Sequence, residues 1–134
     1  MTLILCVDSR GGLLFHGRRQ SQDRLLRQDL LEELNGGRLW VTPYTARQFQ
    51  EQSALSISED PLAQWSNGDF CWIEDLPVQP YLERADRLLL YGWNRVYPTD
   101  CSTPLPPGPP WSLLRQEEFP GFSHDLITKE WYTR

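Results

Sequence analysis

The sequence predicts an α/β domain whose central sheet is mixed, mostly parallel, and antiparallel at its C-terminal end, with helices on its faces. Up to about residue 85, short apolar runs alternate with helix-like segments, which is typical of parallel strands joined by helices. After that point, strand-like segments at 84–93, 111–119 and 124–134 follow one another, and no helix-like stretch separates the last two. We therefore expect one domain over residues 1–134, with about seven or eight strands in its sheet.

The first strand and the first helix are the clearest elements. Residues 3–7 form an apolar run that ends in a polar, glycine-containing loop, as a buried strand does. Residues 11–20 are irregular and punctuated by glycine. Leucines then recur at helical spacing, with Ser21 as the expected cap, Asp23 in the first turn and a stop at 35–37.

The later elements follow from shorter patterns. In chain order, we expect a strand over 38–41, a helix over about 45–52 capped by Thr45, a strand at 55–58, a helical turn at 61–65, a strand over 70–73 and a short helix over 77–85. The passage 104–110 is rich in proline and predicts a stiff connector between two strands.

Charge and composition exclude some classes of partner. The chain carries a formal net charge of −5, whereas a general binder of nucleic acid or of anionic membranes needs a basic surface. No apolar stretch approaches the roughly 20 residues that span a bilayer, and the N-terminus lacks the basic region and the length of a signal peptide. We expect a soluble, cytoplasmic protein that binds neither nucleic acid nor membranes.

Cysteine and histidine are too sparse for a metal site or a disulfide framework. Cys6, Cys71 and Cys101 are odd in number and widely spaced, and no CxxC pair occurs, so neither zinc binding nor disulfides are indicated. His16 and His124 stand alone in the sequence, whereas a catalytic metal site needs several ligands close together. The cysteine pattern is that of a reducing, cytosolic compartment.

The C-terminal segments resemble the last three strands of dihydrofolate reductase. The likeness includes the run Ala-Asp-Arg-Leu-Leu-Leu-Tyr-Gly at 85–92, the turn-rich passage 97–101 and the two closing strands. The start of the chain is similar to that family too: a strand, a glycine-bearing loop, a helix that begins with an acidic residue, a second strand and a Thr-initiated helix. The resemblance implies the family's fold and, with it, an NADPH-dependent reduction of dihydrofolate.

The resemblance also implies positions for the ligand. Asp23 is the nearest match to the family's acid that binds the pterin and relays the proton, and Tyr91 replaces the Thr that supports this carboxylate. The remaining ligand-binding positions are Val7, Arg18, Arg19, Gln20 and Arg24. Three arginines beside a helix N-terminus suit a phosphate or carboxylate.

Structural interpretations stay open for the same residues. Asp23 on its own stabilises a helix N-terminus by about 0.3–1 kcal/mol, without any catalytic role. Asp29 is a weaker candidate for the acid because it lies well inside the helix. The arginines form either an anion site or a solvated loop, and Asp23 is available to pair with Arg19 or Arg24.

The positions that match the family's cofactor site carry different residues in this chain. The Gly-Gly pair, which lets the backbone approach the NADPH diphosphate, is replaced by Glu74 and Asp75. The Gly-Arg pair at the start of the second helix is replaced by Thr42 and Pro43, with Thr45 following, so the Arg that reaches a phosphate is missing. Two carboxylates at short range repel a diphosphate by at least about 1 kcal/mol per close pair. The adenine-binding region is also shortened.

Two functions follow from these observations. The first is a divergent dihydrofolate reductase-like protein without efficient NADPH-dependent reductase activity, which uses no cofactor and binds a small anionic ligand or a protein partner. The alternative is an active NADPH-dependent reductase of dihydrofolate or of a related pteridine or pyrimidine. The replacement of the glycine pair by Glu74 and Asp75 favours the first.

Overall fold

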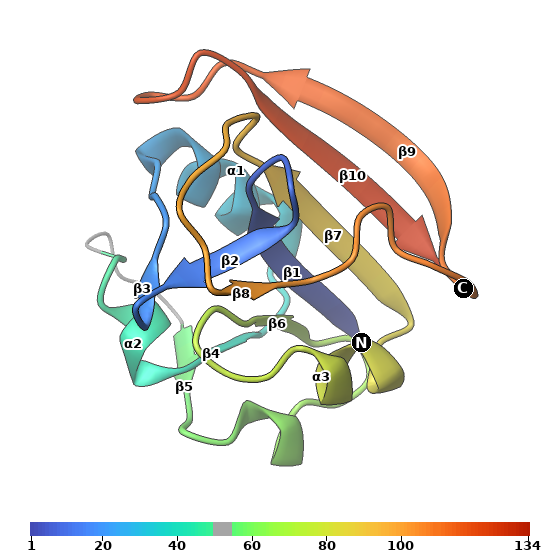
Figure 1. Ribbon diagram of the computed structural model, residues 1–134. Helices are drawn as coiled ribbons and strands as arrows, with labels where there is room; N and C mark the ends of the chain where they lie inside the picture. Colours follow the sequence, from blue (N-terminus) through green and yellow to red (C-terminus); the bar gives the residue numbers. More distant parts are fainter. Residues whose placement is uncertain (50–54) are drawn as a thin grey trace.

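The computed structural model describes residues 1–49 and 55–134, and a seven-stranded sheet forms its centre (Figure 1). Its strands are β1 (Thr2–Val7), β4 (Leu39–Val41), β5 (Leu55–Ile57), β6 (Phe70–Trp72), β7 (Arg87–Gly92), β9 (Ser112–Phe119) and β10 (Ile127–Thr133). They lie in the order β5-β4-β6-β1-β7-β10-β9. The first five strands of this row are parallel, and β10 and β9 are antiparallel to their neighbours. The predicted α/β class and mixed sheet are therefore confirmed.

The central strand β1 is apolar along most of its length because both faces of the sheet are covered. Residues 3–7 are at most 8% exposed. Leu3 and Leu5 belong to one core cluster, and Ile4 and Cys6 belong to a second cluster on the other face. Helix α1 (Arg24–Leu34) packs on the second cluster, and helix α3 (Gln79–Arg84) packs on the first (Figure 1).

Helix α1 begins at Arg24, two residues later than the sequence predicts. Asp23 is extended, with φ −151°, and its carboxylate accepts hydrogen bonds from the N–H groups of Leu25 and Leu26 at 2.9 and 3.3 Å. Asp23 is therefore the N-cap, and the prediction of Ser21 as the cap is wrong. The helix ends where the sequence predicts, at Asn35, which takes a left-handed conformation with φ 47°.

Helix α2 (Pro43–Ala46) begins earlier than predicted. Thr42 is its N-cap, because Thr42 Oγ1 accepts a hydrogen bond from the Thr45 N–H at 3.3 Å. Pro43 follows at the start of the helix, where a missing N–H removes no helical hydrogen bond. Thr45 thus lies inside the helix and is not its cap, and positions 50–52 of the expected helix lie outside the described residues.

The segment 11–20, expected to be irregular, contributes two strands to a second, three-stranded sheet. Strand β2 (Gly12–Phe15) lies between β3 (Arg18–Arg19) and β8 (Cys101–Ser102), and both pairings are antiparallel. The partner β8 is far away in the sequence, so no local pattern reveals the pairing. The small sheet holds the loop after β1 against the loop after β7 (Figure 1).

The remaining elements appear close to their predicted places. Strand β5 and a 3-10 helix, η1 (Pro61–Ala63), lie in the poorly patterned segment before β6. Helix α3 starts at Gln79, and β7 starts only at Arg87 because residue 84 still belongs to the helix. No helix within residues 1–49 and 55–134 is long and apolar enough to cross a membrane.

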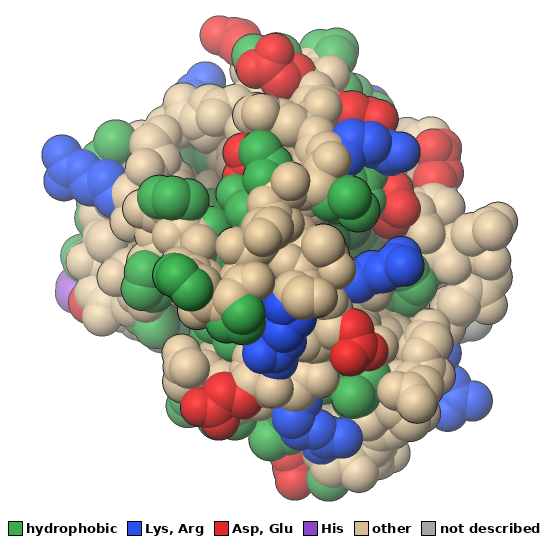
Figure 2. All heavy atoms as spheres, turned by 90° about the vertical axis from the view of Figure 1, so that its right-hand side faces the viewer, with side chains coloured by type: hydrophobic (Ala, Val, Ile, Leu, Met, Phe, Trp, Pro, Cys, Tyr) green, Lys and Arg blue, Asp and Glu red, His purple; other side chains and the backbone are tan. Residues whose placement is uncertain are grey.

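The surface carries charges of both signs. Figure 2 shows Lys and Arg side chains interspersed with Asp, Glu and hydrophobic ones on the face that it presents.

Candidate functional site

Buried polar side chains gather beyond the carboxyl ends of three parallel strands. Asp8 follows β1, Thr42 follows β4, and Glu74 lies just beyond β6. Their exposed fractions are 1%, 2% and 8%. In open α/β sheets, ligands bind beyond the carboxyl ends of the strands. This edge of the sheet is therefore the candidate site, and its hydrogen bonds decide what it can hold.

Glu74 forms a two-point ion pair with Arg19 of strand β3. Arg19 Nε lies 3.1 Å from Oε2, and Arg19 Nη2 lies 3.1 Å from Oε1. Oε1 also accepts hydrogen bonds from Thr45 Oγ1 at 2.8 Å and from Gln48 Nε2 at 3.1 Å. Burial alone would lower the pKa of the Arg19 guanidinium, but the hydrogen bonds and charge of Glu74 raise it. The carboxylate is thus satisfied from within the protein.

Further contacts join residues at the same edge of the sheet. The Arg19 N–H donates to the Tyr44 hydroxyl at 2.7 Å, and the guanidinium carbon lies 4.3 Å from the centre of the Tyr44 ring. Thr42 Oγ1 donates to Asp75 Oδ1 at 2.8 Å. The structure therefore brings together five residues of the predicted site: Arg19, Thr42, Thr45, Glu74 and Asp75. The segments that follow β4 and β6 are hydrogen-bonded directly to each other.

Cys6, near the end of β1, is buried close to this network. Burial raises the pKa of its thiol well above the ordinary value, and the charge of Glu74 raises it further, against the opposing effect of Arg19. The thiolate is the nucleophilic form of cysteine, and a raised pKa keeps the thiol protonated at neutral pH. Cys6 is therefore a residue of the core.

The carboxylate of Asp23 is enclosed by the loop between β9 and β10. Besides capping α1, it accepts hydrogen bonds from the N–H groups of Phe122 at 3.0 Å and Ser123 at 2.9 Å. His124 Nδ1 lies 2.9 Å from its Oδ2 atom. Burial alone would raise the pKa of Asp23, but these hydrogen bonds hold it well below its ordinary value. Asp23 is 2% exposed and is an ionised anchor between two segments of the chain.

His124 extends this anchor to the loop after β7. Its Nε2 lies 2.9 Å from Ser21 Oγ and 3.1 Å from the Tyr97 hydroxyl, and its ring stacks on Trp93 with centroids 4.6 Å apart. The connection from Ser21 through His124 to Asp23 has the order found in serine hydrolases. The imidazole, however, is only 4% exposed, and its Nε2 is shared by two hydroxyls. The cluster therefore serves to tie three loops together.

Tyr91 donates its hydrogen bond to Asp29 and not to Asp23. The side chain is 0% exposed, and its hydroxyl lies 2.7 Å from Asp29 Oδ2. Lys129 Nζ lies 2.7 Å from the same oxygen and 2.7 Å from Glu33 Oε1. Burial raises the pKa of Tyr91 far above its ordinary value, and the charge of Asp29 adds to this shift. Tyr91 is thus a neutral donor to an ion-pair cluster between α1 and β10.

The three arginines of the predicted anion site have different surroundings. Arg19 is paired with Glu74, and the guanidinium carbon of Arg24 lies 4.2 Å from the centre of the Phe122 ring. Arg18 is exposed and lines an open cavity of about 550 Å³. The other residues lining this cavity are Phe15, His16, Arg19, Gln20, Tyr97 and Pro98. Arg18 has no acidic partner among the described residues, so it is the cation that this cavity offers to an anion.

Gln20 and Val7 complete the predicted ligand positions. Gln20 Nε2 donates to Asp8 Oδ2 at 3.1 Å and to the carbonyl of Pro98 at 3.3 Å. Its Oε1 atom is buried and has no hydrogen-bond partner within the described part of the chain. Val7 is 2% exposed and pairs with Gly92 in the sheet, so its side chain belongs to the core.

Sequence reasoning missed the partners of its own site residues. Gln48 lies 26 positions before Glu74, and His124 lies 101 positions after Asp23. The sequence does contain a signal for the cluster around Tyr91. Asp29 and Glu33 are four residues apart, and acidic residues at this spacing lie on the same face of a helix, where one cation can contact both. Within residues 1–49 and 55–134, no group of three or more His, Cys, Asp and Glu side chains is placed to hold a metal ion.

Comparisons with known proteins identify the fold. No protein-family model and no curated protein matches the sequence. Among solved structures, the chain is similar to dihydrofolate reductase from Enterococcus faecalis complexed with NADP(H) and RAB-propyl. The identity is 12%, the TM-score is 0.66, and the match covers 99% of this chain and 95% of that one. The chain therefore has a dihydrofolate reductase-like fold, as the sequence resemblance implied.

Proposed function

We propose that this chain, which has the fold of dihydrofolate reductase, is a divergent binding protein without efficient NADPH-dependent reductase activity. One observation carries the proposal: the two segments that match the sides of the family's diphosphate site are hydrogen-bonded to each other. The bonds join Thr42 to Asp75 and Thr45 to Glu74, each at 2.8 Å. The ligand that we propose is a small anion, with a protein partner as the other possibility for the same scaffold.

The residues at this place do not fit the diphosphate of NADPH. A diphosphate needs backbone N–H groups or cations that have no other partner. Here Arg19 is bound to Glu74, and Asp75 brings a further negative charge to the same edge. Admitting the cofactor requires separation of a buried ion pair, which costs about 3–5 kcal/mol when one partner is left unpaired. The proposal therefore assigns no cofactor to the chain.

The residues that match the family's substrate site favour the same proposal. Asp23 is 2% exposed and Tyr91 is 0% exposed, and both make their hydrogen bonds inside the protein. A general acid must come within hydrogen-bond reach of the group that it protonates. Neither side chain reaches a surface on which a pterin would lie.

We place the ligand in the cavity beside Arg18. The guanidinium supplies the charge, and the rings of Phe15 and Tyr97 supply flat apolar surface. This combination suits a small anion that carries an aromatic ring, and a nucleoside monophosphate has both groups.

Adenosine 5′-monophosphate tests this placement. We expect it to bind with a Kd of about 0.1–1 mM by isothermal titration calorimetry. Arg18→Gln should weaken binding about three- to tenfold, because a charge-assisted hydrogen bond to the phosphate is lost. Arg115→Gln is the matched control, since Arg115 is 59% exposed on the edge strand β9. Equal binding by the Arg18→Gln variant and the unmodified chain would contradict the placement.

An active NADPH-dependent reductase of dihydrofolate, or of a related pteridine or pyrimidine, is the second candidate. It is favoured by the extent of the fold similarity to a reductase complexed with NADP(H), which covers 99% of this chain. Saturable binding of NADPH that is tighter than that of adenosine 5′-monophosphate would support this candidate and count against the first.

A further inference from the structure

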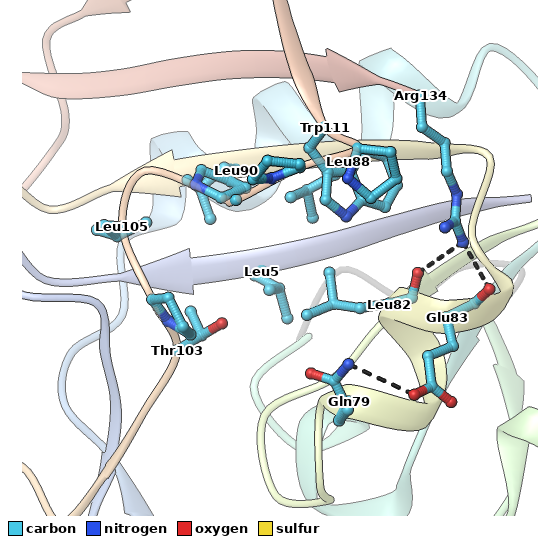
Figure 3. A pocket seen from close by; sticks show the side chains of 15 residues that line it. Leu5, Gln79, Leu82, Glu83, Leu88, Leu90, Thr103, Leu105, Trp111 and Arg134 are labelled. Carbon is cyan, nitrogen blue, oxygen red and sulfur yellow. Dashed lines mark hydrogen bonds between the residues drawn. The ribbon is translucent and has the colours of Figure 1, made fainter.

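A separate cavity of about 240 Å³ lies against the core cluster on the other face of the sheet from α1 (Figure 3). Its floor is formed by Leu5 of β1 together with Leu88 and Leu90 of β7, and Leu82 of α3 projects toward it from the side. None of the residues that line it takes part in the network around Glu74. The cavity is therefore distinct from the candidate site.

The proline-rich connector forms the roof of this cavity. Residues 103–111 contribute four prolines and Trp111 to its lining. Proline rings and the indole are rigid and present flat apolar surfaces. A flat aromatic ring matches the space between such a roof and a floor of leucines. The connector, which the sequence predicts to be stiff, thus has a binding surface beneath it.

The mouth of the cavity is polar, and its charged lining residues are Glu83 and Arg134. The guanidinium of Arg134 is occupied, since it donates to three carbonyl groups at the C-terminal end of α3. Glu83 is exposed, and the hydrogen-bond donor facing its carboxylate is Gln79 Nε2 at 3.5 Å, the outer limit of a hydrogen bond (Figure 3). A carboxylate held this weakly at the mouth of an apolar cavity favours a cationic group.

We propose that this cavity binds a compact aromatic amine. Its ring lies between the leucine floor and the roof of prolines and Trp111, and its ammonium group lies beside Glu83. A cavity of this volume holds a ligand of about a dozen non-hydrogen atoms. The inference does not depend on the proposed function, because it uses other residues.

Tryptamine is the probe that tests this inference, with uncharged 3-ethylindole and anionic indole-3-propionate as matched compounds. Binding is followed by the backbone amide shifts of the ¹⁵N-labelled full chain. We expect shifts in β7 and in 103–111, and binding of tryptamine about three- to fivefold tighter than that of 3-ethylindole. Glu83→Gln should remove this preference. Glu117→Gln, which removes an exposed carboxylate from β9, should leave the preference unchanged.

Filling the cavity provides the second arm of the experiment. Leu82→Trp should weaken tryptamine binding at least about tenfold, because the indole occupies the space of the ligand. Leu105→Trp places the same bulk in the connector and replaces the first variant if thermal melting shows that it does not fold. The proposal is overturned if tryptamine gives no saturable shift up to about 10 mM. It is equally overturned if the shifts map to another surface or if Glu83→Gln keeps the preference for the amine.

Discussion

The purified protein should not turn over dihydrofolate with NADPH at an enzymatic rate. Hydride transfer needs the nicotinamide held against the pterin, and remote contacts to the diphosphate and adenosine supply that positioning. At the positions that match this part of the family's site, the chain has the Arg19–Glu74 pair and the hydrogen bond from Thr42 to Asp75. Loss of three contacts at about 1.5 kcal/mol each weakens cofactor binding by about three decades. The loss of NADPH absorbance at 340 nm measures the rate, with an authentic dihydrofolate reductase as the positive control.

A double variant, Glu74→Gly with Asp75→Gly, tests the proposed reason for the expected lack of reductase activity. It removes both carboxylates from the edge of the sheet and frees the guanidinium of Arg19 for a phosphate. We expect NADPH to bind at least about tenfold more tightly to this variant than to the unmodified chain. Glu117→Ala with Glu118→Ala removes the same charge from β9 and should have no effect. Robust turnover by the unmodified chain would refute the proposed loss of reductase activity.

Asp23→Ala should lower the free energy of unfolding by about 3 kcal/mol, measured by urea denaturation. The substitution removes the N-cap of α1, which contributes about 1 kcal/mol on its own. It also leaves the N–H groups of Phe122 and Ser123 and the imidazole of His124 without their shared acceptor. These two part-buried N–H groups and the buried imidazole, once they lack an acceptor, account for the rest of the expected loss.

Asp60→Ala is the matched control for this substitution. Asp60 also occupies an N-cap position, at η1, but its side chain makes no cap hydrogen bond. We expect a change within about 0.5 kcal/mol for this exposed residue. A similar loss of stability in both variants would show that Asp23 is not the anchor between α1 and the loop at 120–126.

The contribution of Asp23 should depend on pH with a definite sign. Its pKa is lowered in the folded protein, whereas the unfolded chain has the ordinary value of about 3.9. The stabilisation is therefore complete above about pH 5 and is lost progressively as the pH falls below that value. The reason is that the unfolded chain takes up a proton that the folded chain does not. The difference in unfolding free energy between the unmodified chain and Asp23→Asn should accordingly shrink as the pH falls from about 6 to 3. A difference that is constant over this range would contradict the assignment.

Local patterns in the chain are sufficient to predict the fold class. Residues 3–7 are apolar without interruption because both faces of β1 are covered, and the leucines of α1 recur at helical spacing because one side of the helix packs on the sheet. The order of these elements along the chain resembles that of dihydrofolate reductase, and the comparison of structures confirms the fold. The sequence does not identify the N-cap residues correctly. Ser21, Asp23, Thr42 and Thr45 are all residue types that cap helices, so residue type alone does not select among them.

The pairing of polar side chains in and around the candidate site depends on which loops meet in space. Arg19 and Glu74 lie 55 positions apart, and Asp23 and His124 lie 101 positions apart. Each arginine of the basic string had several acidic residues available as partners, and no local pattern selects among them. The small sheet of β2, β3 and β8 makes the selection, because it carries Arg19 over the end of β6 and leaves Arg18 on the outside. Burial then makes the chosen pair costly to separate, since a buried charge without its partner lacks both solvation and a counter-charge.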